Sequence, residues 1–460
     1  MLRRKREKIS LHNTLKRKNT IMKKILILAL LTAVLAVFAA GCSQNDENTL
    51  YFLNFKPESA AAYEKVAMKY KEETGKTLRV VTAASGTYEQ TLKSEISKSD
   101  PPVLFQLNGA NGYNSWKDYC LDLKNTTLYE HLTDPALAIS AGEGVYGLPA
   151  VVEGYGIIYN KAITDRYFSL TNRATNYTSM EDIKSFAALS ALVRDMTQHK
   201  DELGIRGVFA ATSLKSGEDW RFHTHLANLP VYYEFRDREI VLGQSNVDTV
   251  AFSYGNEFKN LFDLYLGNST TDPKLLGSKQ VSDSMSEFAL GQCAMVQNGN
   301  WAWSQIADIS GNTVKAEDIK FLPMYTGVDG EDKQGLCVGT ENYFAVNKQA
   351  PAEKQQLAID FITWLYTSDS GKDLVTNELG FIAPYDTFEE NEAPSDPLGR
   401  EVYSWMNKED VYTVPWVFSV FPGQSFKNDV GAGLLQYAQG TKSFGDVKEI
   451  FVNRWKEEMR

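Results

Sequence analysis

Short apolar runs alternate with longer amphipathic stretches in the N-terminal part of the chain. Runs of four to six mostly apolar residues are typical of buried strands, and stretches with apolar residues three and four apart are typical of helices. We therefore expect strands at residues 50–55, 78–81 and 103–106 and helices at residues 59–74 and 88–98. Gly75 follows the first helical stretch and fits a helix end. Strand and helix alternating at this spacing predict a parallel sheet with helices on its faces.

The same kinds of pattern continue downstream. Two apolar runs broken by glycines and a carboxylate, residues 144–149 and 152–160, are typical of strands that pass a cleft. Thr178 and Glu181 have the spacing of a capping box and predict a long helix that runs to Leu203, before Gly204. Residues 205–320 mix helical and strand patterns and predict a second α/β lobe.

A chain of 460 residues exceeds the usual size of one domain, so two lobes are expected. Later segments at residues 340–347 and 381–384 are interpreted as returning to the first part of the fold. The predicted boundaries place residues 49–155 and 325–380 in lobe 1 and residues 156–324 and 381–460 in lobe 2. No cofactor is expected.

The N-terminus has the pattern of a secretory signal. A basic stretch precedes an apolar run at residues 25–40, which ends at Ala39-Ala40-Gly41-Cys42. Small residues before a cysteine form a lipobox, so residues 1–41 are expected to be removed and Cys42 to carry lipid, with residues 42–48 as a polar leash. The run is short for a helix of ~20 residues that spans a bilayer, although an uncleaved anchor stays an alternative. Met22 is a plausible true start.

Without residues 1–41 the chain holds 38 Lys and Arg against 57 Asp and Glu, a net charge of about −19. Such an acidic surface disfavours nucleic acid and anionic membrane surfaces as partners. Three cysteines remain besides Cys42, namely Cys120, Cys293 and Cys337. Their spacing fits no metal site, and we expect them to be small buried residues.

Two tryptophans carry the most specific chemical signal. Residues 297–306 place Trp301 and Trp303 among amides and a glycine, directly after the apolar run at residues 288–296. Indole faces can stack on the C–H face of a sugar ring while nearby amides bind its hydroxyl groups. The alternative is that both are ordinary core residues. In parallel sheets, ligands bind beyond the carboxyl ends of strands, where Lys56 and Asn108 stand.

Three stretches give the chain a resemblance to a known family. They are residues 291–304, residues 146–161 with Glu153, and residues 344–347 with the helical stretch at residues 361–368. On these residues the chain resembles the extracellular solute-binding proteins of ABC transporters, in the maltose-binding-protein-like carbohydrate group. The resemblance implies an α/β fold of the periplasmic-binding-protein type II. In that fold two lobes, each a sheet flanked by helices, are joined by a hinge of several strands and hold sugar between them.

The resemblance also implies site residues. Trp301 matches the tryptophan that stacks on sugar, Glu153 matches a carboxylate that accepts from hydroxyl groups, and Trp220 is a second aromatic platform. Asn108 lies in the region after the third strand, where the family often has a charged pair, so the chain departs from the family there. The full set of predicted ligand-binding residues is Lys56, Asn108, Glu153, Tyr155, Trp220, Asn300, Trp301 and Trp416. His223 and His225 lack a third ligand for a metal and are interpreted as a mix of helix surface and core.

The sequence therefore predicts a monomeric receptor, anchored by lipid outside the cytoplasm, that captures an oligosaccharide and delivers it to the permease subunits of an ABC importer. One alternative is a surface glycoside hydrolase or lyase, which would need two carboxylates about 5–9.5 Å apart. Glu153, Glu218 and Asp219 are its candidates, and no catalytic motif supports them. Another alternative is a binding protein for a polyamine, since tryptophan faces and carboxylates also bind ammonium groups.

Overall fold

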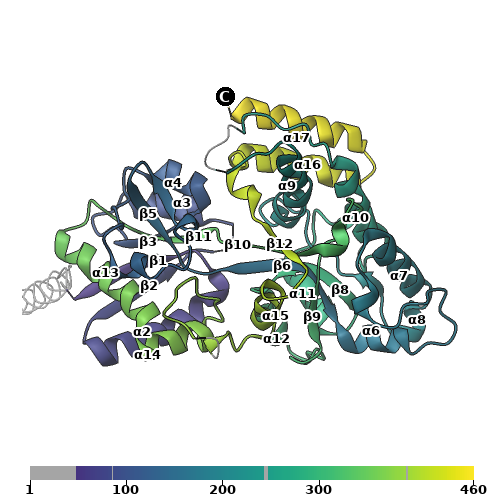
Figure 1. Cartoon of the computed structure of the whole chain (residues 1–460), viewed down its shortest axis with the longest axis horizontal. Coiled ribbons are helices and arrows are strands. Elements are labelled where there is room, and N and C mark those ends of the chain that lie inside the picture. The colour runs from purple at the N-terminus through teal and green to yellow at the C-terminus, as the bar shows by residue number, and fades with distance from the viewer. Residues whose placement is uncertain (1–47, 85, 243–246, 390–391, 460) are drawn as a thin grey trace, which may run out of the picture. The chain divides into compact units, whose positions relative to one another are not determined.

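Two sheets flanked by helices make up the structure, a computed structural model that describes residues 48–84, 86–242, 247–389 and 392–459 (Figure 1). The predicted signal peptide, the alternative start at Met22 and the lipidated Cys42 lie outside the described residues. Residues 50–460 form one compact unit. The predicted α/β class with two sheet-and-helix lobes is confirmed.

The first sheet combines the N-terminal strands with one strand from much later in the chain. Its order is β2 (Thr77–Thr82), β1 (Thr49–Asn54), β3 (Leu104–Asn108), β11 (Asn342–Val346), β5 (Gly144–Pro149) and β4 (Ile139–Ala141). Strands β1 and β3 pair in parallel, as expected. Strand β11 runs antiparallel to both β3 and β5, so the sheet is mixed rather than parallel.

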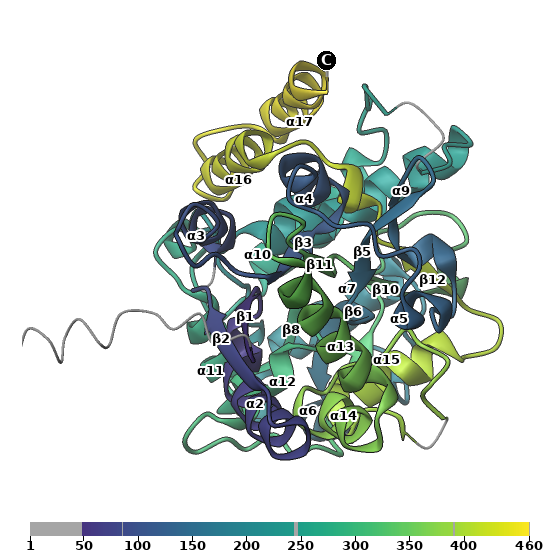
Figure 2. The same ribbon diagram turned by 90° about the vertical axis from the view of Figure 1, so that its left-hand side faces the viewer.

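Helices cover both faces of the first sheet (Figures 1 and 2). On one face, α2 (Ala60–Thr74) and α13 (Ala352–Thr367) bury apolar side chains against β1 and β11. On the other face lie α3 (Tyr88–Glu95) and α4 (Gly109–Trp116). Gly75 ends α2 in the left-handed region, at φ 73°, and donates to the carbonyl of Lys71, as its place in the sequence predicts.

The second sheet has the order β12 (Tyr412–Pro415), β10 (Gln334–Gly339), β6 (Glu153–Asn160), β8 (Cys293–Gly299) and β7 (Gly207–Phe209), and β9 (Ile319–Leu322) also pairs with β6. Strand β10 belongs to this sheet although it lies within residues 325–380. The predicted lobe boundaries as a whole stay a prediction.

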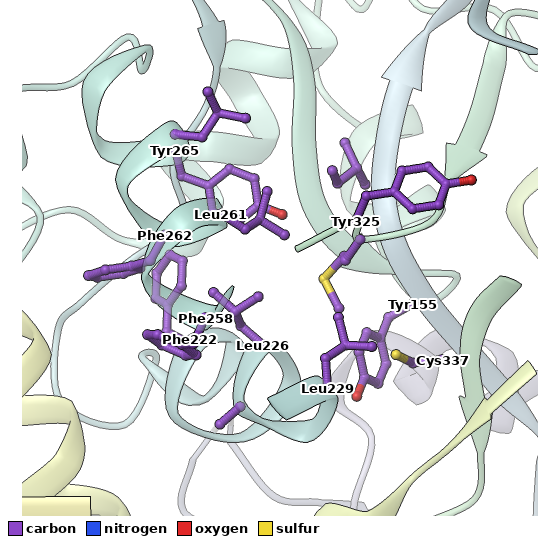
Figure 3. Close-up of a cluster of buried hydrophobic side chains, with 14 of the residues drawn as sticks. Tyr155, Phe222, Leu226, Leu229, Phe258, Leu261, Phe262, Tyr265, Tyr325 and Cys337 are labelled. Carbon is purple, nitrogen blue, oxygen red and sulfur yellow. The ribbon is translucent and has the colours of Figure 1, made fainter. Parts of the chain in front are cut away.

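Helices also pack against the second sheet. On one face lie α11 (Val281–Ala289), α12 (Ala302–Ala307) and α15 (Pro397–Met406). The larger cluster combines α7 (Phe186–Gln198), α9 (Ala227–Asp237), α10 (Gly255–Gly267), α16 (Gln424–Ala438) and α17 (Phe444–Glu458). Figure 3 shows part of this cluster, where α10 contributes Phe258, Leu261, Phe262 and Tyr265.

The prediction of one long helix from residue 178 to residue 203 is wrong. The chain forms a 3-10 turn, η3 (Met180–Asp182), then α7, then α8 (Lys200–Leu203). The capping box pairs Ser179 with Asp182, one residue later than predicted, and Ser185 caps α7 separately. Gly204 ends α8 in the left-handed region, as expected.

Shorter elements complete the described structure. They are η1 (Pro57–Ser59), α5 (Thr127–Glu130), η2 (Pro135–Leu137), α6 (Lys161–Phe168), the π-helix η4 (Arg221–Leu226), η5 (Pro273–Leu275), η6 (Glu331–Lys333), α14 (Asp369–Asp373), the π-helix η7 (Leu374–Glu378) and η9 (Val417–Val420). Cys120, Cys293 and Cys337 are buried and free of disulfides, as predicted. None of the described helices is long and apolar enough to cross a membrane.

The chain passes from the first sheet to the second at residues 150–152 and returns at residues 340–341. Glu153 begins β6 directly after the first crossing, and Glu341 lies within the second. The crossings therefore bring two carboxylates to the junction of the sheets.

Candidate functional site

A buried ion pair lies where the two sheets meet. Lys56 follows β1, and its Nζ lies 2.7 Å from Oε1 of Glu153, with the two residues only 6 % and 3 % exposed. Burial alone would lower the pKa of Lys56, but Glu153 and Glu58 together raise it. Burial raises the pKa of Glu153, and Lys56 opposes that shift. Each charge thus depends on the other for its stability in this environment.

Two half-buried tryptophans lie beside the ion pair. Trp301 stands between β8 and α12, and its Nε1 donates to Asn298 Oδ1 at 2.9 Å. Its ring centroid lies 6.0 Å from that of Trp220, and Lys56 Nζ lies 5.8 Å from the Trp301 ring. Arg221 stacks on Trp220, with 3.8 Å from its guanidinium carbon to the ring centroid. Apolar faces and charged groups therefore adjoin.

Tyr155 and Trp416 form a deeper layer around a histidine that the sequence did not single out as a site residue. The Tyr155 ring stacks on His225 at 4.0 Å between centroids, and Trp416 lies 5.5 Å from Tyr155. The hydroxyl of Tyr155 donates to the His225 carbonyl. Tyr155 is fully buried and Trp416 is 5 % exposed. Through His225, these rings pack behind Trp220 and Trp301.

His223 and His225 differ from their predicted mix of helix surface and core, because both are buried in the π-helix η4. Burial lowers the pKa of each imidazole. The neutral His225 ring suits its packing among the aromatic side chains, whereas His223 contacts Thr224 and Asp219. Among the described residues, no group of three or more His, Cys, Asp and Glu side chains is placed to hold a metal ion.

Asn300 supports the backbone of the site. Its Oδ1 accepts from the Gly154 amide at 3.0 Å, which ties the end of β8 to the start of β6. A pocket of about 230 Å³ lies between these elements and the returning segment of the chain. Its lining includes Lys56, Glu58, Glu153, Asn300, Trp301, Trp303, residues 377–381, Ser395 and Asp396.

Asn108 stands apart from the other seven predicted residues. It precedes α4 and pairs in register with Asn342 of β11. Within the described part of the chain, its side chain forms no hydrogen bond, ion pair or ring contact with the other seven. The remaining seven are linked by the ion pair, by ring contacts that pass through His225, and by the hydrogen bond of Asn300 to the Gly154 amide.

The sequence analysis missed two charged residues near this cluster, Glu341 and Lys427. Burial and the charge of Glu153 raise the pKa of Glu341 to about 7. Burial lowers the pKa of Lys427, which lies in the first turn of α16. No motif marks either residue, because only the fold brings the crossing segment after β10 close to the start of α16.

Comparisons with solved structures show the same fold. A chitin oligosaccharide binding protein has a TM-score of 0.67 and 17 % identity, over 89 % of this chain and 98 % of that chain. The solute-binding protein RafE in complex with raffinose gives 0.65 and 15 %, over 89 % and 99 %. A sugar transporter protein from Bacillus licheniformis in complex with stachyose gives 0.65 and 16 %, over 90 % and 100 %. A comparison with curated proteins gives no match.

Residues 65–398 match the model of a family described as bacterial extracellular solute-binding protein. The match spans β3, β5, β6, β8 and β11, which build both sheets and carry Glu153. Because this match covers well over half of the chain, the protein belongs to the bacterial extracellular solute-binding proteins.

Proposed function

We propose that this protein is the lipid-anchored substrate-binding component of an ABC importer, which captures an oligosaccharide and delivers it to the permease. One observation carries the proposal: the rings of Trp220 and Trp301 lie 6.0 Å apart beside the buried pair of Lys56 and Glu153. Flat apolar faces next to charged hydrogen-bonding groups match a sugar ring, which has C–H faces and hydroxyl edges.

Capture depends on groups from both sheets. Lys56 comes from the end of a strand of the first sheet, whereas Glu153, Trp220 and Trp301 come from the second sheet and its helices. A ligand that contacts both sets stabilises the arrangement in which they are close, which is the closure mechanism known for binding proteins of this type. The permease then distinguishes loaded from empty protein through that difference.

Several features support the oligosaccharide and the anchor. The solved structures with the same fold include complexes with raffinose and stachyose. The lipobox that ends at Cys42 supports a lipid anchor, and two acyl chains give stable membrane attachment. Membership in an extracellular family places the protein outside the cytoplasm.

The two alternatives, a hydrolase or lyase and a polyamine-binding protein, have less support. The family consists of binding proteins, which argues against a hydrolase or lyase, and Glu153 is held by Lys56 rather than free to transfer a proton. A polyamine site has one observation in its favour, because Glu58, Glu153, Glu378 and Asp396 all line the pocket. Lys56 lies among them and offsets part of that charge.

A thermal-shift screen tests the proposal. The full-length protein in mild detergent is screened against mono- and oligosaccharides and polyamines, and the same samples are analysed for cleavage products. A ligand at 100 times its dissociation constant adds about 2.7 kcal/mol of stability. We expect a rise in melting temperature with one class of oligosaccharide and no products. A response to polyamines alone, or cleavage of a sugar, contradicts the proposal.

A further inference from the structure

Two charged side chains at the junction of the sheets act on each other electrostatically but form no direct contact. Glu341 and Lys427 are both partly buried. Within the described residues, neither side chain forms a hydrogen bond or an ion pair with another side chain. The nearby Lys56 and Glu153 form a close pair. A partly buried charge without a direct hydrogen bond or ion pair is costly, so it points to a group that arrives from outside.

The backbone fixes the place of Glu341. Gly339, two residues earlier, lies opposite Glu153 in the ladder of β10 and β6. The carbonyl of Glu341 accepts from the amide of Gly109, the first residue of α4, at 2.7 Å. Glu341 is thus held between the crossing strands and the start of a helix of the first sheet.

Contacts of α16 place Lys427 at the same junction as Glu341. Gly431, one turn later on the same helix face, packs so closely that a Cβ there would lie 2.0 Å from Asp219 Oδ2. The segment before α16 also contacts α4, because Asn111 Nδ2 donates to the Phe421 carbonyl at 2.5 Å. Helix α4 therefore contacts both the Glu341 backbone and the segment that leads to Lys427.

Buried polar atoms without partners cluster at the same junction. They are Oγ1 of Thr340, Nε1 of Trp416 and Nδ1 of His225, in residues that are 7 %, 5 % and 2 % exposed. Trp416 packs directly on Gly339, where a Cβ would lie 2.6 Å from Cγ of the indole. The His225 ring centroid is 6.0 Å from that of Trp416. Native proteins rarely leave such atoms unsatisfied, so several at one place indicate a polar ligand.

We propose that Glu341 and Lys427 bind two neighbouring hydroxyl groups of a neutral sugar unit at the end of the ligand beyond Trp416 and His225. This inference rests on the proposed function and adds that the sugar unit bound at this end of the site is neutral. A hydroxyl group donates to a carboxylate and accepts from an ammonium group, so a vicinal diol satisfies both charges. An acidic or amino sugar would pair with one charge and add a like charge beside the other.

The inference predicts that binding depends on pH. The groups that interact with Glu341 are Glu153 and the buried Tyr155 of β6, Lys56 after β1, Lys427 of α16 and the buried Tyr343 of β11. Burial and Glu153 raise the pKa of Glu341 to about 7, against the opposing effect of Lys427 and Lys56. A hydroxyl donor needs the ionised carboxylate, so affinity rises between pH 6 and pH 8. With the apparent affinity set by the ionised fraction, the gain is up to about tenfold.

Calorimetric titration of the full-length protein in detergent tests the inference. The probes are raffinose, stachyose and a chitin oligosaccharide as neutral sugars, with chitosan and uronic-acid oligosaccharides as charged ones. The protein variants are Glu341→Gln, Lys427→Gln and Trp301→Ala. Lys93→Gln and Glu449→Gln, at exposed positions of α3 and α17, are matched controls for the loss of charge. Melting temperatures without ligand show that each variant is folded.

We expect a neutral oligosaccharide to bind more tightly at pH 8 than at pH 6. Glu341→Gln should weaken binding about tenfold at pH 8 and reduce its pH dependence, and Lys427→Gln should weaken it at both pH values. Normal affinity and pH profile in both variants, with binding lost only in Trp301→Ala, overturns this inference and leaves the proposed function standing. Binding of charged oligosaccharides alone also overturns it. Binding of no oligosaccharide overturns both.

Discussion

Lys56 and Glu153 form a buried ion pair, with 2.7 Å between Nζ and Oε1, that joins the end of β1 to the first residue of β6. Removal of one partner leaves the other charge buried and unpaired, which costs about 3–5 kcal/mol. Lys56→Met or Glu153→Gln should each lower the free energy of unfolding by that order, and the double variant should lose less than the sum. Urea unfolding measures all three.

The matched control for this prediction is Lys69→Gln, which breaks two surface pairs, with Glu72 and Glu73. Exposed pairs contribute about 0–1 kcal/mol, so this variant should unfold nearly as the parent does. Strictly additive losses from Lys56→Met and Glu153→Gln would show that the pair does not couple the two sheets.

Stability of the protein without ligand should fall as the pH rises from about 4.5 to about 7. The pKa of Glu341 and that of Asp396 are both raised to about 7, mainly by burial. In this window the folded state keeps protons that the unfolded state has lost, so the free energy of unfolding decreases with rising pH. The loss levels off about one pH unit above these pKa values, near pH 8.

Glu341→Gln and Asp396→Asn should each flatten that pH profile and raise stability at pH 8 relative to pH 5. Asp396 caps α15 by accepting from the Gly399 amide, and asparagine keeps this cap. Chemical unfolding at a series of pH values gives the profiles. An unchanged slope in both variants would assign the pH dependence to other groups.

Cys42→Ser should release the protein from the membrane. The prediction follows from the lipobox, since a serine cannot carry the thioether-linked lipid. Fractionation of cells that express the parent or the variant measures the share in the membrane. A variant that stays with the membrane would favour an uncleaved anchor formed by the apolar run at residues 25–40.

Local patterns predicted the first strands and helices well. Short apolar runs and the glycine after residue 74 define β1, α2 and β2 without help from the rest of the fold. The parallel character of the first sheet was overestimated because β11, which comes from residues 342–346, enters it antiparallel. A strand inserted from far along the sequence leaves no local signal.

The same limit applies to the site. Trp301, Trp303 and Glu153 lie in recognisable sequence motifs. Glu341, Lys427 and His225 do not, and they become neighbours of the site only through the crossings and the π-helix η4. The predicted helix from residue 178 to residue 203 failed because two caps, at Ser179 and Ser185, divide it. Sequence spacing alone does not decide which of several adjacent polar residues caps a helix.

The most direct test of the account is the affinity of the oligosaccharide found in the screen for the parent, Trp301→Ala and Trp364→Ala, measured by calorimetry. Trp364 packs on Tyr70 of α2, away from the site, and serves as the matched control. We predict a loss of about tenfold or more for Trp301→Ala, since stacking contributes ~1 kcal/mol beyond the buried area, and little change for Trp364→Ala. Equal affinity of the parent and Trp301→Ala would contradict the claim that Trp220 and Trp301 hold the sugar.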